Sequence, residues 1–274
     1  MKLPLIQLLA LLSAATAGAQ TIDPARVVSV PTQAVQGSLV KGRAPVGARV
    51  RVFGKDIRVG KSGHFVFAVP RDTRGFVTVR ITQGEPAPID VRVEVLPKAW
   101  VEQRVDGVPQ STVTPPPAIA ARIAREQAEV VAARKRDDDR EDFLQTFIWP
   151  VKGRISGQFG NRRVYNGQPG AAHSGADIAA PTGTPIRAPA DGVISFANKD
   201  LYLTGGTVVL DHGFGVSTNY LHMSRIDVKP GDRVRQGQVI GAVGATGRAT
   251  GPHLHWGMSW FETRVDPLLL VKAP

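Results

Sequence analysis

The chain of 274 residues contains no cysteine, so it can form neither disulfides nor thiolate metal sites. Any metal ion must therefore be held by histidine, aspartate or glutamate side chains. Aromatic residues make up only 6% of the sequence, which is too sparse for a surface that stacks nucleic-acid bases, and we find no nucleic-acid-binding motif. We therefore expect no nucleic acid among its partners.

Long hydrophobic runs are missing as well. The apolar run over residues 3–12 is shorter than the roughly 18 residues that a membrane-spanning helix needs. It follows Lys2 and precedes small residues that end at Ala19, which is the layout of a cleavable secretory signal. We therefore predict a signal peptide over residues 1–19 and an exported protein, periplasmic or extracellular, that does not span the membrane.

The formal net charge is +11, and the excess is shared between two regions. Residues 20–114 carry +6 and residues 146–274 carry +5, whereas residues 115–145 are nearly balanced. Basic proteins attract polyanions in general. For an exported protein these are anionic polymers of the cell envelope, such as cell wall, anionic lipid or lipopolysaccharide, which we expect as possible partners.

Residues 20–114 read as a set of short strands. Residues 49–52, 77–81 and 91–95 each alternate apolar with polar side chains, as half-buried strands do, and turn residues separate them. This spacing predicts a small β-sandwich of immunoglobulin-like form. Its histidine, His64, adjoins a turn and is expected at a surface or sheet edge rather than in a metal site.

Residues 115–145 predict one linking α-helix. Thr114 and Pro115 suit a helix start, and the stretch from Ala118 to about Asp142 lacks glycine and proline. The charged run over residues 134–142 has two interpretations, a partner-binding site or a solvated helix end with internal ion pairs.

Residues 146–274 predict a second domain that is almost wholly β-sheet. Nineteen of the 29 glycines lie between Gly153 and Gly257, which indicates many tight turns, and no long helical period occurs. Residues 228–234 and 237–241 look like paired hairpin strands.

Five of the six histidines fall within the last 102 residues. In a strand, side chains two apart share a face, so His253 and His255 are expected to point together, with Leu254 on the opposite face. A hydrolytic zinc site uses three protein ligands and one open position. His173, Asp177 and one of this histidine pair can supply such a set.

Two further histidines lie nearby in the sequence. His222 follows Tyr220-Leu221, and His212 follows Asp211 in a predicted turn. For His212 we expect a turn role or a supporting role rather than metal ligation.

From about residue 148 to residue 270 the sequence resembles the lysostaphin-type, or LytM-like, zinc metallopeptidases that cut the peptide part of peptidoglycan. The matching segments are Phe159-Gly160-Asn161-Arg162-Arg163, His173-Ser174-Gly175-Ala176-Asp177, Pro181-Thr182-Gly183-Thr184-Pro185, Ala188-Pro189-Ala190-Asp191-Gly192-Val193, Tyr220-Leu221-His222 and Gly247-Arg248-Ala249-Thr250-Gly251-Pro252-His253-Leu254-His255. Met223 stands where such enzymes often have leucine, and both are apolar. Neither residues 20–114 nor the predicted helix are covered by the resemblance.

The resemblance implies a role for each matching residue. His173, Asp177 and His255 would be the ligands of one zinc ion per chain, and His222 and His253 the catalytic pair that does not bind the metal. It also implies an antiparallel β-sheet peptidase domain over residues 146–274 that hydrolyses the peptide stems of peptidoglycan.

Two other functions remain open at this point. Some relatives of this family have lost zinc ligands and activate cell-wall amidases instead, and the complete set of five residues argues against that. The hairpin motifs also resemble lipoyl and biotinyl carriers, but such carriers have no use for a histidine cluster.

Overall fold

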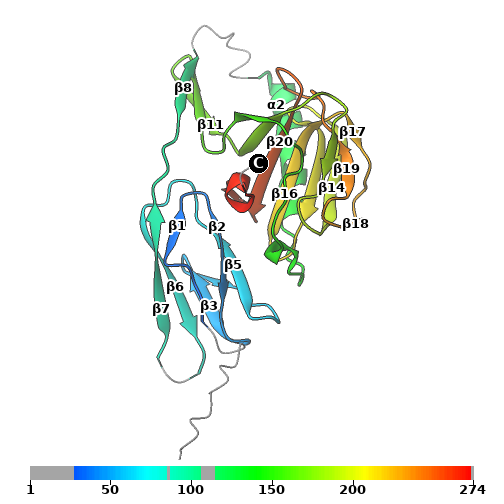
Figure 1. Cartoon of the computed structure of the whole chain (residues 1–274). Helices are drawn as coiled ribbons and strands as arrows, with labels where there is room; N and C mark the ends of the chain where they lie inside the picture. Colours follow the sequence, from blue (N-terminus) through cyan, green and yellow to red (C-terminus); the bar gives the residue numbers. More distant parts are fainter. Residues whose placement is uncertain (1–27, 85–86, 106–114, 273–274) are drawn as a thin grey trace, which may run out of the picture.

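The computed structural model describes residues 28–84, 87–105 and 115–272. The predicted signal peptide over residues 1–19 lies outside this range. The described chain is mainly β-sheet, as predicted, and forms two parts, with helix α2 (Pro117–Arg134) packed on the second (Figure 1). Among the described residues, no helix is both long and apolar enough to cross a bilayer.

The first part is a β-sandwich made of a five-stranded and a two-stranded sheet. The larger sheet has the order β1-β7-β6-β3-β4, and the smaller one pairs β2 with β5. The strands are β1 (Gln33–Val35), β2 (Leu39–Arg43), β3 (Arg49–Val52), β4 (Lys55–Ile57), β5 (His64–Ala68), β6 (Gly75–Thr82) and β7 (Ile89–Leu96). The three strands predicted from alternation are confirmed as β3, β6 and β7, while the immunoglobulin-like topology stays a prediction.

Alternation explains how this sandwich is built. Inward residues such as Val50 and Phe65 are fully buried in one apolar cluster between the sheets. Outward residues are charged and pair across neighbouring strands, as Arg80 does with Asp90 at 2.6 Å. His64 begins β5 half-buried, with its Nδ1 2.7 Å from the Ser62 hydroxyl, in the edge position expected of it.

The second part is built on an antiparallel sheet of eight strands. Its order is β18-β14-β15-β16-β20-β12-β9, and β21 pairs with β20. The strands are β9 (Arg154–Gly157), β12 (Gly175–Ala179), β14 (Gly192–Leu201), β15 (Gly205–Asp211), β16 (Val216–Met223), β18 (Arg233–Val234), β20 (His253–Trp260) and β21 (Thr263–Val265). Two smaller sheets flank it, β13 (Pro185–Arg187) with β19 (Val239–Ala242) and β17 (Arg225–Ile226), and β8 (Glu102–Val105) with β10 (Arg162–Tyr165) and β11 (Gln168–Ala172).

The two faces of the eight-stranded sheet differ in character. On one, which we call the core face, Ile178, Tyr220, Leu254 and Trp256 are fully buried in an apolar cluster. The register pairs Asp177 with His255 and His255 with Leu221, so these residues share the other face, which we call the site face.

The predicted pairing of residues 228–234 with 237–241 is wrong. Strand β18 pairs with β14, and β19 pairs with β13 and β17. The turn folds back on the large sheet instead, because Gly231 donates its N–H to the carbonyl of Ile194 at 2.9 Å.

The predicted helix forms, but it ends at Arg134 rather than near Asp142, and it begins at Pro117 with Pro116 as its cap. Three consecutive aspartates after the last turn would meet the negative end of the helix dipole. They bind cations in a loop instead. Asp137 binds Arg58 at 2.9 Å and Asp139 binds Lys61 at 3.1 Å, both in the sandwich.

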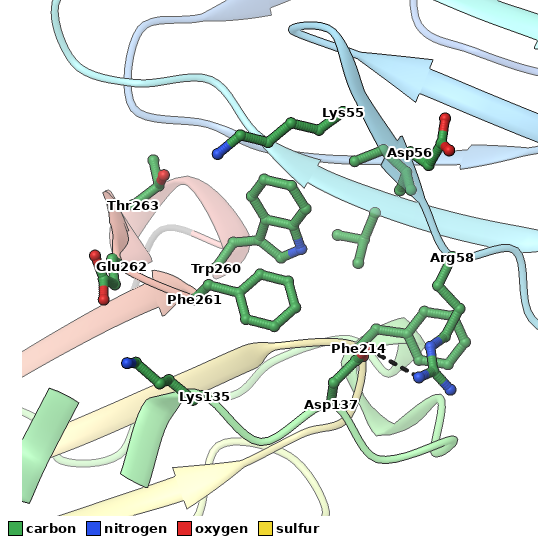
Figure 2. Close-up of a pocket in the computed structure, with 12 residues that line it drawn as sticks. Lys55, Asp56, Arg58, Lys135, Asp137, Phe214, Trp260, Phe261, Glu262 and Thr263 are labelled. Carbon is green, nitrogen blue, oxygen red and sulfur yellow. Dashed lines mark hydrogen bonds and ion pairs between the residues drawn. The ribbon is translucent and has the colours of Figure 1, made fainter. Parts of the chain in front are cut away.

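The charged run therefore joins the two parts of this chain and is not a helix end, although the internal ion pairs predicted for it are present, as between Arg136 and Asp138 at 2.6 Å. Figure 2 shows this contact, with Arg58 reaching Asp137 while Trp260 and Phe261 at the β20–β21 turn face the sandwich. The guanidinium carbon of Arg58 also lies 5.5 Å from the ring centroid of Phe214.

A second contact joins the two parts nearer the metal-ligand candidates. Strand β8, within the range predicted for the first domain, runs parallel to β10 in the second part. Ahead of it, Lys98 reaches the buried carboxylate of Asp266 at 2.6 Å.

Candidate active site

Two adjacent strands bring three predicted metal ligands together. Strand β12 carries Asp177 and β20 carries His255, and these two residues are direct partners in the antiparallel register. His173 lies two residues before β12 and turns toward the same point. Its Nε2 is 3.1 Å from Asp177 Oδ1 and 3.1 Å from His255 Nδ1, and His255 Nδ1 is 2.9 Å from the same oxygen.

These three side chains form a compact donor group, each offering one ligand atom within 4.8 Å of the others. Two imidazole nitrogens and one carboxylate oxygen are ligands that zinc accepts in catalytic sites with an open fourth position. Three such atoms crowded around one point, with His255 buried, fit a cation better than any set of direct hydrogen bonds. The residues present therefore fit a zinc ion.

The ring of His173 is oriented by a neighbour outside the cluster. A carbonyl oxygen can only accept, so His173 Nδ1 donates to the carbonyl of Gln158 at 3.0 Å, and in the neutral ring Nε2 is then the nitrogen whose lone pair can bind a metal. Two glycines make room for the cluster. A Cβ on Gly157 would lie 2.4 Å from Asp177 Oδ2, and one on Gly175 would lie 2.9 Å from His255 Nε2.

His222 and His253 form a second pair beside this group. Their ring centroids are 4.8 Å apart, and the His222 ring lies 6.5 Å from that of His255. Each donates from Nδ1 to a carbonyl, His222 to Thr246 at 2.8 Å and His253 to Gly251 at 2.8 Å. In its neutral form, each ring therefore presents Nε2 as the nitrogen that can take up a proton.

His222 reaches this place through an unusual backbone conformation. Its φ is 64°, in the left-handed region that non-glycine residues rarely occupy. The pairing of β15 with β16 shifts register at this point, and the His222 N–H donates to the Thr204 carbonyl at 2.8 Å. A bulge of this kind re-aims a side chain next to a functional site.

The electrostatics favour neutral rings at His222 and His255 and an ionised carboxylate at Asp177. Burial lowers the pKa of His255 to about 4, although the hydrogen bond to Asp177 opposes this shift. Burial also lowers the pKa of His222, against the opposing hydrogen bond to Thr246. For Asp177, burial would raise the pKa, but the interactions of its carboxylate with His173 and His255 outweigh it and hold that pKa below its usual range.

The segment that leaves the sandwich braces the loop before His173. The Trp100 ring packs edge-on against Phe159 with centroids 5.8 Å apart, and Asn161 accepts from the Val101 N–H at 3.1 Å. The Arg71 guanidinium donates to the Gly160 carbonyl at 2.8 Å. The first part of the chain therefore helps to position the second part's candidate ligands.

His212 is not part of this donor group. It is fully buried, donates from Nδ1 to the Asp191 carbonyl at 2.7 Å, and its Nε2 accepts from the Thr218 hydroxyl at 2.9 Å. Sequence reasoning missed two supporting residues, Ser174, whose hydroxyl is 3.4 Å from His255 Nε2, and Thr246. Ser174 adjoins a candidate ligand in sequence, whereas no sequence signal indicates Thr246.

Comparison with known proteins identifies the family to which the second part is similar. Residues 171–267 match the profile of peptidase family M23. The peptidoglycan DD-endopeptidase ShyA of Vibrio cholerae is 42% identical over 140 residues, which is 51% of this chain and 32% of ShyA. The cell division protein DipM of Caulobacter vibrioides is 34% identical over 170 residues, or 58% of this chain and 26% of DipM. The chain thus spans about a third or less of the length of these relatives.

A solved structure with 33% sequence identity matches most of the chain. It is a crystal structure described as a peptidase M23 from Pseudomonas aeruginosa, with a TM-score of 0.66. The match covers 86% of this chain and 94% of that one, so it includes the first part as well as the second. This chain therefore belongs to peptidase family M23.

Proposed function

We propose that the protein is an exported zinc metalloendopeptidase that hydrolyses peptide cross-links of peptidoglycan. The observation that carries this proposal is the convergence of His173, Asp177 and His255 on one point, with His222 and His253 beside it. The name of ShyA, a peptidoglycan DD-endopeptidase, supports the substrate class. The apolar, small-residue N-terminus supports export to the periplasm or the extracellular space.

His173, Asp177 and His255 would hold one zinc ion per chain. When bound, zinc supplies Lewis acidity, which lowers the pKa of water and polarises a peptide carbonyl. The carboxylate of Asp177 balances part of the cation's charge. The hydrogen bond from His173 to Gln158 keeps the ligand nitrogen turned inward.

His222 and His253 supply the proton chemistry. A neutral Nε2 can accept a proton as a nucleophile forms and can return it to the leaving amine. The other histidine, once protonated, can donate a hydrogen bond to the oxygen that develops negative charge. We assign these two tasks jointly to the pair, because both rings have the same free nitrogen.

Digestion of purified sacculi tests this function. The mature protein, reconstituted with zinc, should release fragments whose masses identify cleaved peptide cross-links, and sacculi of different chemotypes should identify the bond. Intact sacculi after reconstitution with verified zinc would contradict the proposal.

The second candidate is a regulator that binds peptidoglycan and activates a cell-wall amidase. It is favoured by the similarity to DipM, which is named as a cell division protein rather than as a hydrolase. An activator needs a shaped surface and no proton transfer. Two results together would favour this candidate. The wild-type protein would cleave no peptidoglycan, and it would stimulate an amidase to the same extent as the His222→Ala variant.

The basic charge of both parts also leads us to propose a weak attraction to anionic envelope polymers. Exposed charges are screened over about 8 Å at physiological ionic strength. Binding to sacculi should therefore weaken as salt rises. If the amount of protein that pellets with sacculi did not depend on salt, this attraction would be rejected, whereas the proposed hydrolase activity would not be affected.

A further inference from the structure

A cavity of about 370 Å³ lies between helix α2 and the site face of the large sheet. Its walls include Gln127 and Arg134 from the helix, and Ser174, Asn219 and Arg264 from the sheet side. We call it the α2 cavity. The helix is anchored beside it by Val130, which packs on Val209 and Leu201.

One end of the α2 cavity adjoins the candidate active site. Ser174 lines the cavity and its hydroxyl is 3.4 Å from His255 Nε2. Thr204 also lines it and accepts the backbone N–H of His222. Leu221, a third lining residue, is the register partner of His255 on the site face. A substrate held at the histidine cluster can therefore extend into this cavity.

The other end holds two arginines that lack acidic partners. Arg134 is only 8% exposed, and its buried Nε has no hydrogen-bond partner among the described residues. Arg264 donates to the Ser259 hydroxyl at 3.0 Å. Within the described ranges, no carboxylate oxygen lies within 4.0 Å of either guanidinium.

The two positive charges also repel each other. Burial lowers the pKa of Arg134 to about 9, and the charge of Arg264 adds to this shift, opposed in part by the exposed Glu262. Burial lowers the pKa of Arg264 to about 10. Both remain charged at neutral pH.

A purely structural role explains this pair poorly. Arg134 sits in the last turn of α2, where a cation does interact favourably with the helix dipole. That benefit is available to an exposed side chain and does not require burial beside a second arginine. A buried charge without a partner is unfavourable, whereas a guanidinium binds a carboxylate through two parallel hydrogen bonds.

We propose that the α2 cavity is a subsite for a carboxylate of the peptide substrate, bound by Arg134 and Arg264. This inference rests on the proposed function. Arg264 pairs with Ser259, four residues beyond His255 along β20, a distance of about 13 Å in a strand. An extended peptide advances by a similar rise per residue, so the carboxylate lies within about four residues of the scissile bond.

The test compares two peptidoglycan dimers, one with free carboxylates on its peptide stems and one with the same carboxylates amidated. The zinc-loaded wild-type protein should show a KM about tenfold to a hundredfold higher for the amidated dimer, because charge-assisted hydrogen bonds are lost. Arg264→Met and Arg134→Met should raise KM for the free dimer by a similar factor and abolish the difference. Their zinc content and kcat should stay near those of the wild type.

Arg125→Met is the matched control, since Arg125 lies on the exposed side of the same helix and carries the same charge. It should leave KM unchanged. If Arg125→Met raised KM by the same factor, general charge attraction would explain the effect and the subsite would be rejected. Wild-type cleavage of both dimers with equal KM would overturn the inference while leaving the hydrolase intact.

Stability and binding supply readouts that do not depend on cleavage. Without substrate, Arg134→Met should not lower the thermal midpoint, because it removes a buried unpaired charge. A lower midpoint with unchanged KM would show a structural role and overturn the inference. If the wild type cleaves neither dimer, the hydrolase fails, and calorimetric titration of both dimers into wild type and Arg264→Met decides the subsite. Equal affinities of the wild type for the free and the amidated dimer in this titration would also overturn the subsite.

Discussion

The core face and the site face of the large sheet are made by the same strands, but one packs apolar side chains and the other carries the histidine cluster. Along β20, Leu254 and Trp256 are fully buried against apolar neighbours on one face, while His253 and His255 point to the other. Along β12, Ile178 and Asp177 divide in the same way. If the site face carries the proposed chemistry, neighbouring residues serve stability and chemistry separately, and we expect adjacent substitutions to have separable effects.

The largest effect is expected for a proposed metal ligand on the site face. Asp177→Asn keeps the size of the side chain but removes the charge that faces His173 and His255. We expect zinc to fall from about one per chain to a small fraction, with no detectable cleavage, because catalytic zinc sites use three protein ligands. Elemental analysis and fragment release should be measured on the same preparations.

Asp200→Asn is the control for that experiment, because the Asp200 side chain is 93% exposed on the same domain. It should leave zinc and cleavage unchanged. Full zinc occupancy in Asp177→Asn would remove this residue from the proposed ligand set.

The next effect separates the two histidine groups within the site face. His222→Ala should retain zinc and lower cleavage by about 10²–10⁴-fold, because it removes proton transfer and no ligand. The measurement pairs zinc content with the rate of fragment release. Loss of zinc together with activity would mean that ligands and proton-transfer groups are wrongly divided.

A substitution on the core face should do the opposite. Leu254→Ala lies between His253 and His255 but is fully buried on the core face, and we expect a loss of about 2–5 kcal/mol in the free energy of unfolding. Below its unfolding temperature, this variant should still bind zinc and cleave.

Leu254→Met conserves volume and should be destabilised by less than about 1.5 kcal/mol. Chemical denaturation of both variants measures these differences. Zinc loss in folded Leu254→Ala would show that the two faces are coupled more tightly than alternation implies.

A smaller effect concerns pH and His212, which contacts Thr218 on the core face. Burial lowers the pKa of His212 to about 4, so the folded protein keeps it neutral where the unfolded chain takes up a proton. The contribution of His212 to the free energy of unfolding is therefore complete above pH 6.5 and is lost as the pH falls toward 4. The loss amounts to about 3 kcal/mol of unfolding free energy.

His212→Asn retains a donor for the Asp191 carbonyl but does not titrate. The difference in unfolding free energy between wild type and variant should therefore shrink as the pH falls from 7 to 4.5. A difference that is constant across this range would contradict the assignment, since the other histidines titrate in both proteins.

Much of this arrangement could be predicted because it depends on local patterns. Alternation at residues 49–52 and 91–95 predicts β3 and β7, since each strand buries one face. The His253–Leu254–His255 pattern likewise predicts which side chains share a face of β20. The end of α2 was predicted several residues beyond Arg134, because the aspartates that follow this residue bind Arg58 and Lys61, which are distant in the sequence.

By itself, the sequence determined the residue types that can hold a metal, the spacing of His173 and Asp177, and the face on which His255 lies, because chemistry and strand periodicity are local. Tertiary structure decided where the side chain of His222 points. Alternation from Leu221 would place it on the core face, but contacts to Thr204 and Thr246 hold its backbone at a φ of 64° and turn it to the site. Tertiary structure also placed Arg134 near Arg264 at the α2 cavity, because only packing brings the end of helix α2 and strand β21 together.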